Sequence, residues 1–524
     1  MPSPSYRIDL RPCIPVRCRS RTEYVGLRAL FANAHHIDDL ALPLPPAHSG
    51  LLRILAAITA RITALDDPAM PIDDWLEHRQ RCLERPDGFP AKTVHDYFDA
   101  YDFDLFGVRP WLQDPALADQ CPQSSGINAL VFGRPSGNNL AWFSTHTDTN
   151  PQPLPAREAL WHLVAYHYYG PAGRCATRNV DSLKSGRGQA GPLRSTVSFH
   201  PHGRTLHETL LLHQSPYRGD GQLPGADACP WEEPAAPDPL RPPPEVTWPA
   251  RLLTGRSMHA ALLIPDPSGH YATDAYLTWA TQHPRLKATD PYLIYDPDPD
   301  APAEPRTPRR ADADRALWRD LDAMLLAGDE SQPGRRPEAF TTLNSLPEPA
   351  RSQLRVRVCG FDQEGRVNNR IWYTALTPPI WPWAQEHDPD KASRIAECRQ
   401  AAESMAGVLY EAVGRAWHET NRLGSSTAAW RKAARRSPWP RQALAAYWPR
   451  AEDAFWQLID DDRHARGVFA AEAINALLQA TASALNHFTQ AGPALARALQ
   501  ALRAAGAAPD DTTTPAPGAV HAQP

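Results

Sequence analysis

The sequence predicts an α+β protein in which a large mixed α/β domain, residues 1–380, precedes a C-terminal bundle of four helices, residues 381–507. Three observations support this prediction. Apolar residues recur at helical spacing through long segments after Pro382. Two β-rich runs flank a polar tip before that residue, which is typical of a hairpin. The final residues, 508–524 (APDDTTTPAPGAVHAQP), are expected to be disordered.

Short elements are expected along the first domain. Residues 7–16 are expected to form a strand that enters a sheet. Residues 47–65 are predicted to form a helix, because apolar side chains lie three or four residues apart along one face: Leu51, Leu55, Ile58, Ile62 and Leu65. Residues 160–169 and 206–213 are expected to form further helices.

The hairpin and the bundle complete the expected elements. Residues 354–359 and 370–376 are predicted strands on either side of the tip. Residues 395–412, 444–459 and 469–488 each show helical apolar spacing, and antiparallel helices that share an apolar seam form a bundle.

Composition limits the possible environments and cofactors. The net charge is −5, and eight cysteines are scattered without a C-x-x-C pair. We therefore expect free thiols, no bound metal and no other cofactor. No stretch approaches the ~20 consecutive apolar residues that a membrane span needs, and the N-terminus has no secretory h-region. A cytoplasmic protein without a membrane partner is expected.

No catalytic motif stands out. The chain lacks a phosphate-binding G-x-x-x-x-G-K loop, a G-x-S-x-G elbow and an H-E-x-x-H metal motif. His162 and His167 are five residues apart, which is off the i,i+4 spacing of a helical metal pair. We therefore expect no catalytic residues and a non-enzymatic function.

A glycine-rich segment at residues 168–194 suits a phosphate backbone. It carries one acid, Asp181, against five positive side chains: Arg174, Arg178, Lys184, Arg187 and Arg194. Glycine lets a backbone approach a ligand closely, and successive loop N–H groups can bind an anion. The DNA-binding candidates here are Gly170, Gly173, Arg174, Lys184 and Arg187. A flexible surface loop is the alternative.

A basic stripe follows in the C-terminal region, between residues 422 and 441, where no acid occurs. Its four central members share one helical face and are DNA-binding candidates: Arg431, Lys432, Arg435 and Arg436. An unbalanced basic stripe repels itself, so a polyanion is a natural partner. A solvated helix face is the alternative.

The hairpin tip supplies the last candidates, Gln363, Glu364 and Gly365. Its composition does not suit a clamp on the DNA backbone, but it could wedge between base pairs or read the edge of a groove. An ordinary turn is the alternative.

With these segments in view, the chain resembles the CasA family, the large subunits of type I-E CRISPR Cascade complexes. The resemblance lies in IDLRPCIPVR, INALVFGRPSG, GPLRSTVSFHPHGRTLHETLL and CGFDQEGRVNNRIWYTALTPPI, in that order. Two positions depart from the family pattern. Cys13 replaces an aromatic residue, and Val131 occupies an aromatic slot that Phe132 follows. The cysteine-rich insertion of some members is absent, so no metal is carried over.

The resemblance implies a role in RNA-guided DNA recognition. A loop near the guide RNA would contain Asn128, Val131, Phe132 and Arg134. The glycine loop and the hairpin would recognise the protospacer-adjacent motif in double-stranded target DNA and start its opening. The other partners implied are the remaining Cascade subunits and a helicase-nuclease recruited after target binding. A protein-binding scaffold and an enzyme with an unrecognised active site are the alternatives.

Overall fold

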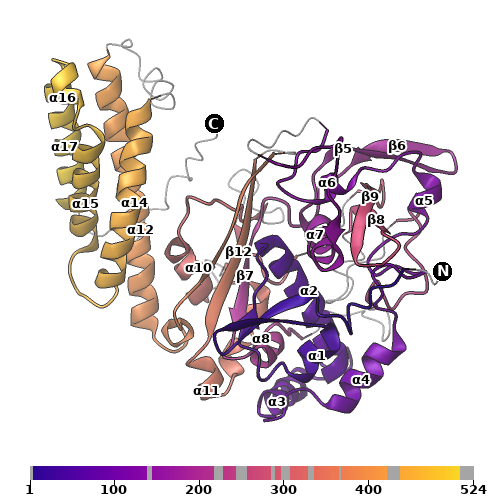
Figure 1. The fold of residues 1–524 in the computed structure, drawn as a ribbon. Helices are drawn as coiled ribbons and strands as arrows, with labels where there is room; N and C mark the ends of the chain where they lie inside the picture. Colours follow the sequence, from indigo (N-terminus) through magenta and orange to yellow (C-terminus); the bar gives the residue numbers. More distant parts are fainter. Residues whose placement is uncertain are drawn as a thin grey trace. The chain divides into compact units, whose positions relative to one another are not determined.

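The computed structural model describes residues 4–137, 144–216, 228–242, 257–284, 289–296, 307–327, 335–364, 368–421 and 437–507. The chain forms two compact units (Figure 1). The first contains Met1–Pro297, Pro305–Asp314 and Arg336–Trp381; the second contains Asp298–Glu304, Arg315–Arg335 and Pro382–Pro524. The predicted fold class, mixed α/β followed by a helical bundle, is confirmed. The expected disordered tail, residues 508–524, lies outside the described residues.

All strand pairs in the first unit are antiparallel. One sheet has the order β2-β1-β3, with β1 (Ile14–Cys18), β2 (Arg21–Val25) and β3 (Asp39–Leu40). A second has the order β4-β9-β8, with β4 (Leu154–Pro155), β8 (His259–Pro265) and β9 (Tyr271–Trp279). A third has the order β13-β12-β7, with β7 (Val197–His202), β12 (Arg355–Glu364) and β13 (Asn368–Leu376). Two ribbons are β5 (Gly173–Val180) with β6 (Leu183–Gly188), and β10 (Tyr295–Asp296) with β11 (Thr307–Pro308).

The first unit has one buried helix, α2, against which α4, α7 and α8 pack. The helices of this unit are α1 (Leu27–Ala32), α2 (Pro45–Thr63), α3 (Ile72–Leu83), α4 (Ala91–Ala100), α5 (Leu117–Gln120), α6 (Ile127–Leu130), α7 (Ala156–Tyr169), α8 (Leu206–Leu212) and α11 (Glu348–Arg351). Every residue of α2 except Arg61 is buried, and a helix buried on all sides lies inside a core. It contacts α7, α8 and β12 (Figure 1).

Several element boundaries differ from the sequence predictions. The predicted helices at 47–65, 160–169 and 206–213 are confirmed as α2, α7 and α8. The expected strand at 7–16 is wrong over most of its length, because turns occupy residues 8–12 and β1 starts only at Ile14. Arg7 forms a single β-bridge with Asp104.

The second unit contains four long helices within the described residues: α12 (Pro389–Thr420), α14 (Pro438–Leu458), α15 (Ala465–Ala480) and α17 (Ala491–Ala507). Contacts of α12 with the other three, of α14 with α15 and of α15 with α17 define the bundle. The helix expected at 469–488 is interrupted after α15 and resumes as α16 (Ala484–His487). Thr481 ends α15, and its Oγ1 donates a hydrogen bond to Leu477 O (2.8 Å).

The second unit also includes Arg315–Arg335, which the sequence placed in the first domain. Its helical elements are η1 (Leu317–Asp320) and α10 (Leu321–Leu325). Arg319 Nε donates to Glu403 Oε1 (2.8 Å), and Arg399 Nη2 donates to Asp322 Oδ2 (2.8 Å). Each ion pair joins this segment to α12 across about eighty residues of sequence, which no local pattern reveals.

A buried ion pair between Arg53 on α2 and Asp290 lies at the centre of the first unit. The two side chains are 2% and 3% exposed. All five N–H donors of the guanidinium are used: two bond the Asp290 carboxylate, one bonds Ser198 Oγ, and two bond Ser49 O and Oγ. Because every donor is satisfied, the desolvation cost of this buried charge is offset.

A chain of hydrogen bonds continues from Ser49 through two buried histidines. His213 Nδ1 lies 2.6 Å from Thr209 O, which only accepts, so Nδ1 carries the proton. The neutral ring therefore accepts at Nε2 from His200 Nδ1 (3.1 Å). His200 Nε2 in turn accepts from Ser49 Oγ (2.9 Å). Both rings must be neutral, and burial lowers the pKa of His213 to about 4 and that of His200 well below its usual value.

Because this chain of hydrogen bonds needs neutral histidines, we expect the fold to lose stability in acid. Because the pKa of His213 is about 6.5 when unfolded and about 4 when folded, its stabilising contribution is complete above pH 6.5 and is lost as the pH falls toward 4. The variant His213→Gln should lose stability at pH 7.5, and its free energy of unfolding should fall less steeply on acidification, by about 1.4 kcal/mol per pH unit. Urea unfolding at several pH values measures this. The exposed His270→Gln is the control, and an unchanged slope in His213→Gln would contradict the assignment.

Candidate nucleic-acid interface

Arg178 anchors the β5–β6 ribbon to the rest of the first unit. Its side chain is 1% exposed and donates to Asp114 Oδ2 (2.6 Å), to Gln120 Oε1 (2.7 Å) and to Trp279 O (3.1 Å). Trp279 Nε1 also donates to Ser185 O on β6 (2.9 Å). Arg178, counted among the five positive side chains of this segment, is therefore a structural residue and is not available to a ligand.

Three of the predicted DNA-binding residues are exposed cations of the ribbon: Arg174 on β5, with Lys184 and Arg187 on β6. Arg174 and Arg187 are directly opposite in the register, an arrangement that repels itself unless a counter-charge is present. Within the described residues, none of the three forms an ion pair.

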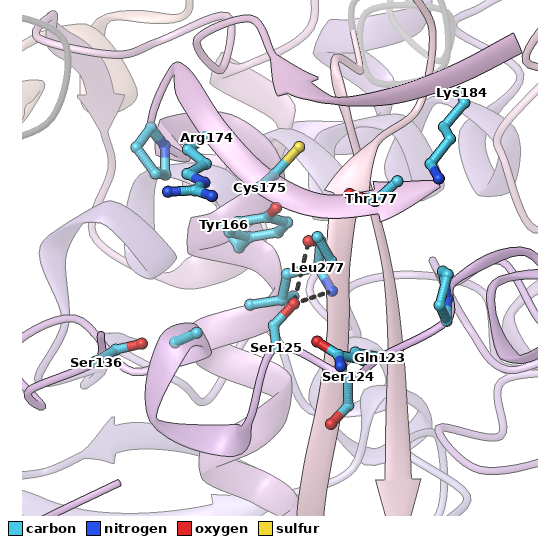
Figure 2. A pocket seen from close by; sticks show the side chains of 14 residues that line it. Gln123, Ser124, Ser125, Ser136, Tyr166, Arg174, Cys175, Thr177, Lys184 and Leu277 are labelled. Atoms are coloured by element: carbon cyan, nitrogen blue, oxygen red, sulfur yellow. Dashed lines mark hydrogen bonds between the residues drawn. The ribbon is translucent and has the colours of Figure 1, made fainter. Parts of the chain in front are cut away.

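A polar hollow of about 500 Å³ lies beside the ribbon (Figure 2). Arg174 and Lys184 reach it from the ribbon, and Gln123, Ser124 and Ser125 line it from the segment before α6. Its other lining residues are Pro122, Ala129, Ser136, Tyr166, Pro171, Cys175, Ala176, Thr177 and Leu277. None of the described residues that line it carries a carboxylate, so the hollow combines two cations with hydroxyl and amide groups. This chemistry suits a phosphate.

The Ser125 hydroxyl holds the floor of this hollow in place. Leu277 N donates to Ser125 Oγ (3.0 Å), and Ser125 Oγ donates to Leu277 O (3.2 Å), which fixes the segment against β9 (Figure 2). Gln123, Ser124 and Ser125 were not among the predicted site residues, because a short polar run has no periodicity or charge that distinguishes it from an ordinary loop.

The two candidate glycines have different roles. A Cβ on Gly170 would lie 2.6 Å from Tyr166 O and 2.8 Å from the His259 ring, so Gly170 is required by packing. A side chain at Gly170 would therefore disturb the fold itself, whatever its effect on a ligand. Gly173 has φ +105° and open space around its Cβ position, so its backbone is accessible to a ligand.

Gln363 lies within strand β12 and not at the hairpin tip, where the sequence predicted it. Strand β12 extends to Glu364, and Gln363 pairs with Asn369 instead of forming the turn. Gln363 is 2% exposed; its Oε1 accepts from Ser195 N (3.0 Å), and its Nε2 donates to Asn369 Oδ1 (2.7 Å) and Tyr169 O (3.2 Å). These long-range bonds extend the strand beyond its apolar run. The Glu364 side chain and Gly365 lie outside the described residues.

The loop that starts at α6 is held by its own candidate residues. Asn128 is 2% exposed and donates through Nδ2 to Thr147 O (3.0 Å). Arg134 Nη1 donates to Gln152 O (2.8 Å), and Phe132 packs edge-to-face on Phe361 with ring centroids 5.4 Å apart. Val131 is half-buried. Asn128, Val131 and Phe132 therefore shape the loop, and Arg134 is the one candidate here with a charge for a ligand.

The predicted basic stripe, Arg431, Lys432, Arg435 and Arg436, lies outside the described residues. Across the described part of the chain, no group of three or more His, Cys, Asp or Glu side chains is arranged to hold a metal ion. In the same part, no helix combines the length and the apolar character needed to cross a bilayer.

Known proteins share this fold and sequence. A family model described as CRISPR-associated protein Cse1 matches residues 10–487. The CasA/Cse1 protein of Thermus thermophilus is 29% identical over 341 residues, which span 60% of this chain and 59% of that relative.

Two solved structures illustrate the range of similarity. A chain of a CRISPR RNA-guided surveillance complex is 35% identical, with a TM-score of 0.83 and coverage of 96% of this chain and 99% of that one. The crystal structure of Cse1 from Acidimicrobium ferrooxidans is 21% identical, with a TM-score of 0.71 and coverage of 97% and 99%, and supports the fold alone. Because the family model spans most of the sequence, the chain belongs to the Cse1 family of CRISPR-associated proteins, also called CasA.

Proposed function

We propose that this chain is a non-catalytic DNA-recognition subunit of a type I-E CRISPR surveillance complex in the cytoplasm. The observation that carries the proposal is the β5–β6 ribbon, where Arg174, Lys184 and Arg187 are exposed without ion pairs among the described residues. Similarity to a chain of an RNA-guided surveillance complex over nearly the whole length supports it.

The ribbon would hold the phosphates of double-stranded target DNA beside the flanking motif. Arg174 and Lys184 would place one phosphate at the hollow, where Ser124 offers a hydroxyl donor. Gly173 would allow close approach of the backbone to a groove edge. Guide RNA pairing would supply sequence specificity, and this chain would read only the short flank.

Gln363 would position the hairpin without touching DNA. Its bonds to Ser195, Tyr169 and Asn369 fix the end of β12. The residues after Glu364 would then start duplex opening. Other subunits and the guide RNA would complete the complex, and a helicase-nuclease would be recruited after target binding.

The exposed cations of the ribbon give a test of DNA binding. Reversing Arg174, Lys184 and Arg187 to Glu should weaken binding of the complex to duplex DNA, and the plot of log K against log salt should become shallower by up to about 2.7, since each lost phosphate contact removes about 0.9. Fluorescence anisotropy at several salt concentrations measures both effects. The matched control reverses three exposed arginines elsewhere, Arg81, Arg85 and Arg503. Equal salt slopes in the two triple variants would rule out the ribbon as a phosphate site.

The buried bonds of Gln363 give a second test. The variant Gln363→Ala should lower the free energy of unfolding by about 1–3 kcal/mol, because the buried Ser195 N–H loses its acceptor. Binding to intact duplex and to a target already melted beside the flank should therefore weaken together. Thermal unfolding and binding to both targets measure this. Unchanged stability with a loss on intact duplex alone would instead make Gln363 part of a wedge.

A further inference from the structure

The β1–β2 hairpin carries arginines that the proposed DNA site does not use. Its two-residue turn consists of Arg19 and Ser20, with φ of 47° and 72°. Such turns favour Asn and Gly, because both central residues adopt the left-handed conformation. Here an arginine occupies a strained position at the exposed end of the hairpin, and strain of this kind is grounds to look for a function.

The charge around this turn is unbalanced. Arg11, Arg17, Arg19 and Arg21 are exposed, and none forms an ion pair with a residue that the structure describes. The neighbouring Asp9 is already paired with both Arg7 and Arg28. Asp38 accepts a hydrogen bond from the Arg19 backbone N–H (2.8 Å). Glu23 is the one acid on the two strands, so the hairpin is a basic surface.

An exposed aromatic ring, Tyr24, lies on the same hairpin opposite Pro15. It is 42% exposed and stacks on the buried Trp161, with ring centroids 6.5 Å apart and an interplanar angle of 16°. Trp161 is itself fixed, because its Nε1 donates to Cys13 O (2.8 Å). The guanidinium of Arg157, one turn earlier on α7, lies 4.9 Å from the Tyr24 ring centre and is 44% exposed.

Two further observations show which parts of the first unit lie next to this surface. Burial and the nearby Cys13 raise the pKa of Tyr6 to about 12, while Arg157 and Arg11 oppose the rise, so both arginines lie near the same buried ring. Phe132, in the loop that follows α6, also packs against His162 on α7, with ring centroids 6.3 Å apart. The surface at the start of α7 therefore adjoins the loop that follows α6.

We propose that Tyr24, Arg157 and the hairpin arginines bind a single-stranded segment of the guide RNA, an inference that rests on the proposed function. An unpaired base stacks on the Tyr24–Arg157 pair, and the phosphates on either side contact Arg17, which shares the Tyr24 face of the hairpin, and Arg19 in the turn. Aromatic rings interleaved with cations bind single strands in this way, and arginine planes also stack on RNA bases.

The composition of the surface argues against the other possible occupants. A duplex offers no free base face to an aromatic side chain. A protein partner needs an interface core that is poor in charge, yet between residues 4 and 40 only Leu10 and Tyr24 are large, apolar and exposed in the described structure. The guide RNA is the single strand that a surveillance complex carries permanently.

The test measures binding of a labelled single-stranded RNA to the full chain. Tyr24→Leu should weaken binding about 5-fold or more, and Tyr24→Phe should bind like the natural chain, because it keeps the ring. Reversing Arg17 and Arg19 to Glu should reduce the salt slope by about 1.4, since each lost contact to a single strand removes about 0.7. Tyr271→Leu, at an equally exposed tyrosine on β9, is the matched control. RNA binding that is unchanged in Tyr24→Leu and in the arginine variant would overturn the proposal.

Crosslinking in the reconstituted complex identifies the strand. With benzoylphenylalanine in place of Tyr24, light should attach this chain to the guide RNA. A crosslink only to target DNA or to another subunit would refute the proposal. Binding of flank-containing duplex to the complex should be unaffected in Tyr24→Leu, so failure here is distinguishable from failure of the DNA-recognition function, which the ribbon variants test.

Discussion

The buried Arg53–Asp290 ion pair is the constraint on which the first unit depends. It ties the core helix α2 to the segment before β10 and, through Ser198, to β7. Because β7 pairs with β12 in register from His202–Arg355 to Val197–Gly360, fixing β7 also fixes the start of the hairpin. The end of the hairpin near Gln363 is held in turn by Ser195, which lies two residues before β7 in the chain. A buried charge tolerates little displacement, since any lost hydrogen bond exposes its desolvation cost.

Sequence periodicity predicted the helices that turn one continuous apolar face to the core. Helices α2, α7 and α8 and the bundle helices α12, α14 and α15 were predicted from the sequence, and the apolar spacing of a helix depends only on which face meets the core. No periodic segment predicted α17. Boundaries set by distant partners were not predictable. Strand β12 continues to Glu364 because Ser195 and Tyr169 bond Gln363, and these partners are 168 and 194 residues away. Arg315–Arg335 joins the bundle for the same reason, through ion pairs with α12.

The candidate site shows the same division. An excess of cations predicted Arg174, Lys184 and Arg187, which the structure leaves exposed. The same excess included Arg178, and only the fold distinguishes it, because Asp114 comes from another part of the chain. Composition equally could not separate Gly170, which is packed against His259, from Gly173, which is open. Residue type indicates what chemistry is possible, and tertiary packing decides which side chains remain free to perform it.

The overall charge of −5 is compatible with a polyanion partner, because electrostatic attraction is local in salt. At physiological ionic strength the screening length is about 8 Å, so a phosphate responds to the cations within a few residues of it. Many arginines of this chain are neutralised internally, as Arg53, Arg178 and Arg319 are by Asp290, Asp114 and Glu403. Internal pairing removes these charges from the surface in equal numbers of both signs. The side chains of the β5–β6 ribbon and the β1–β2 hairpin that form no ion pair among the described residues remain available to a ligand, and their local charge is positive.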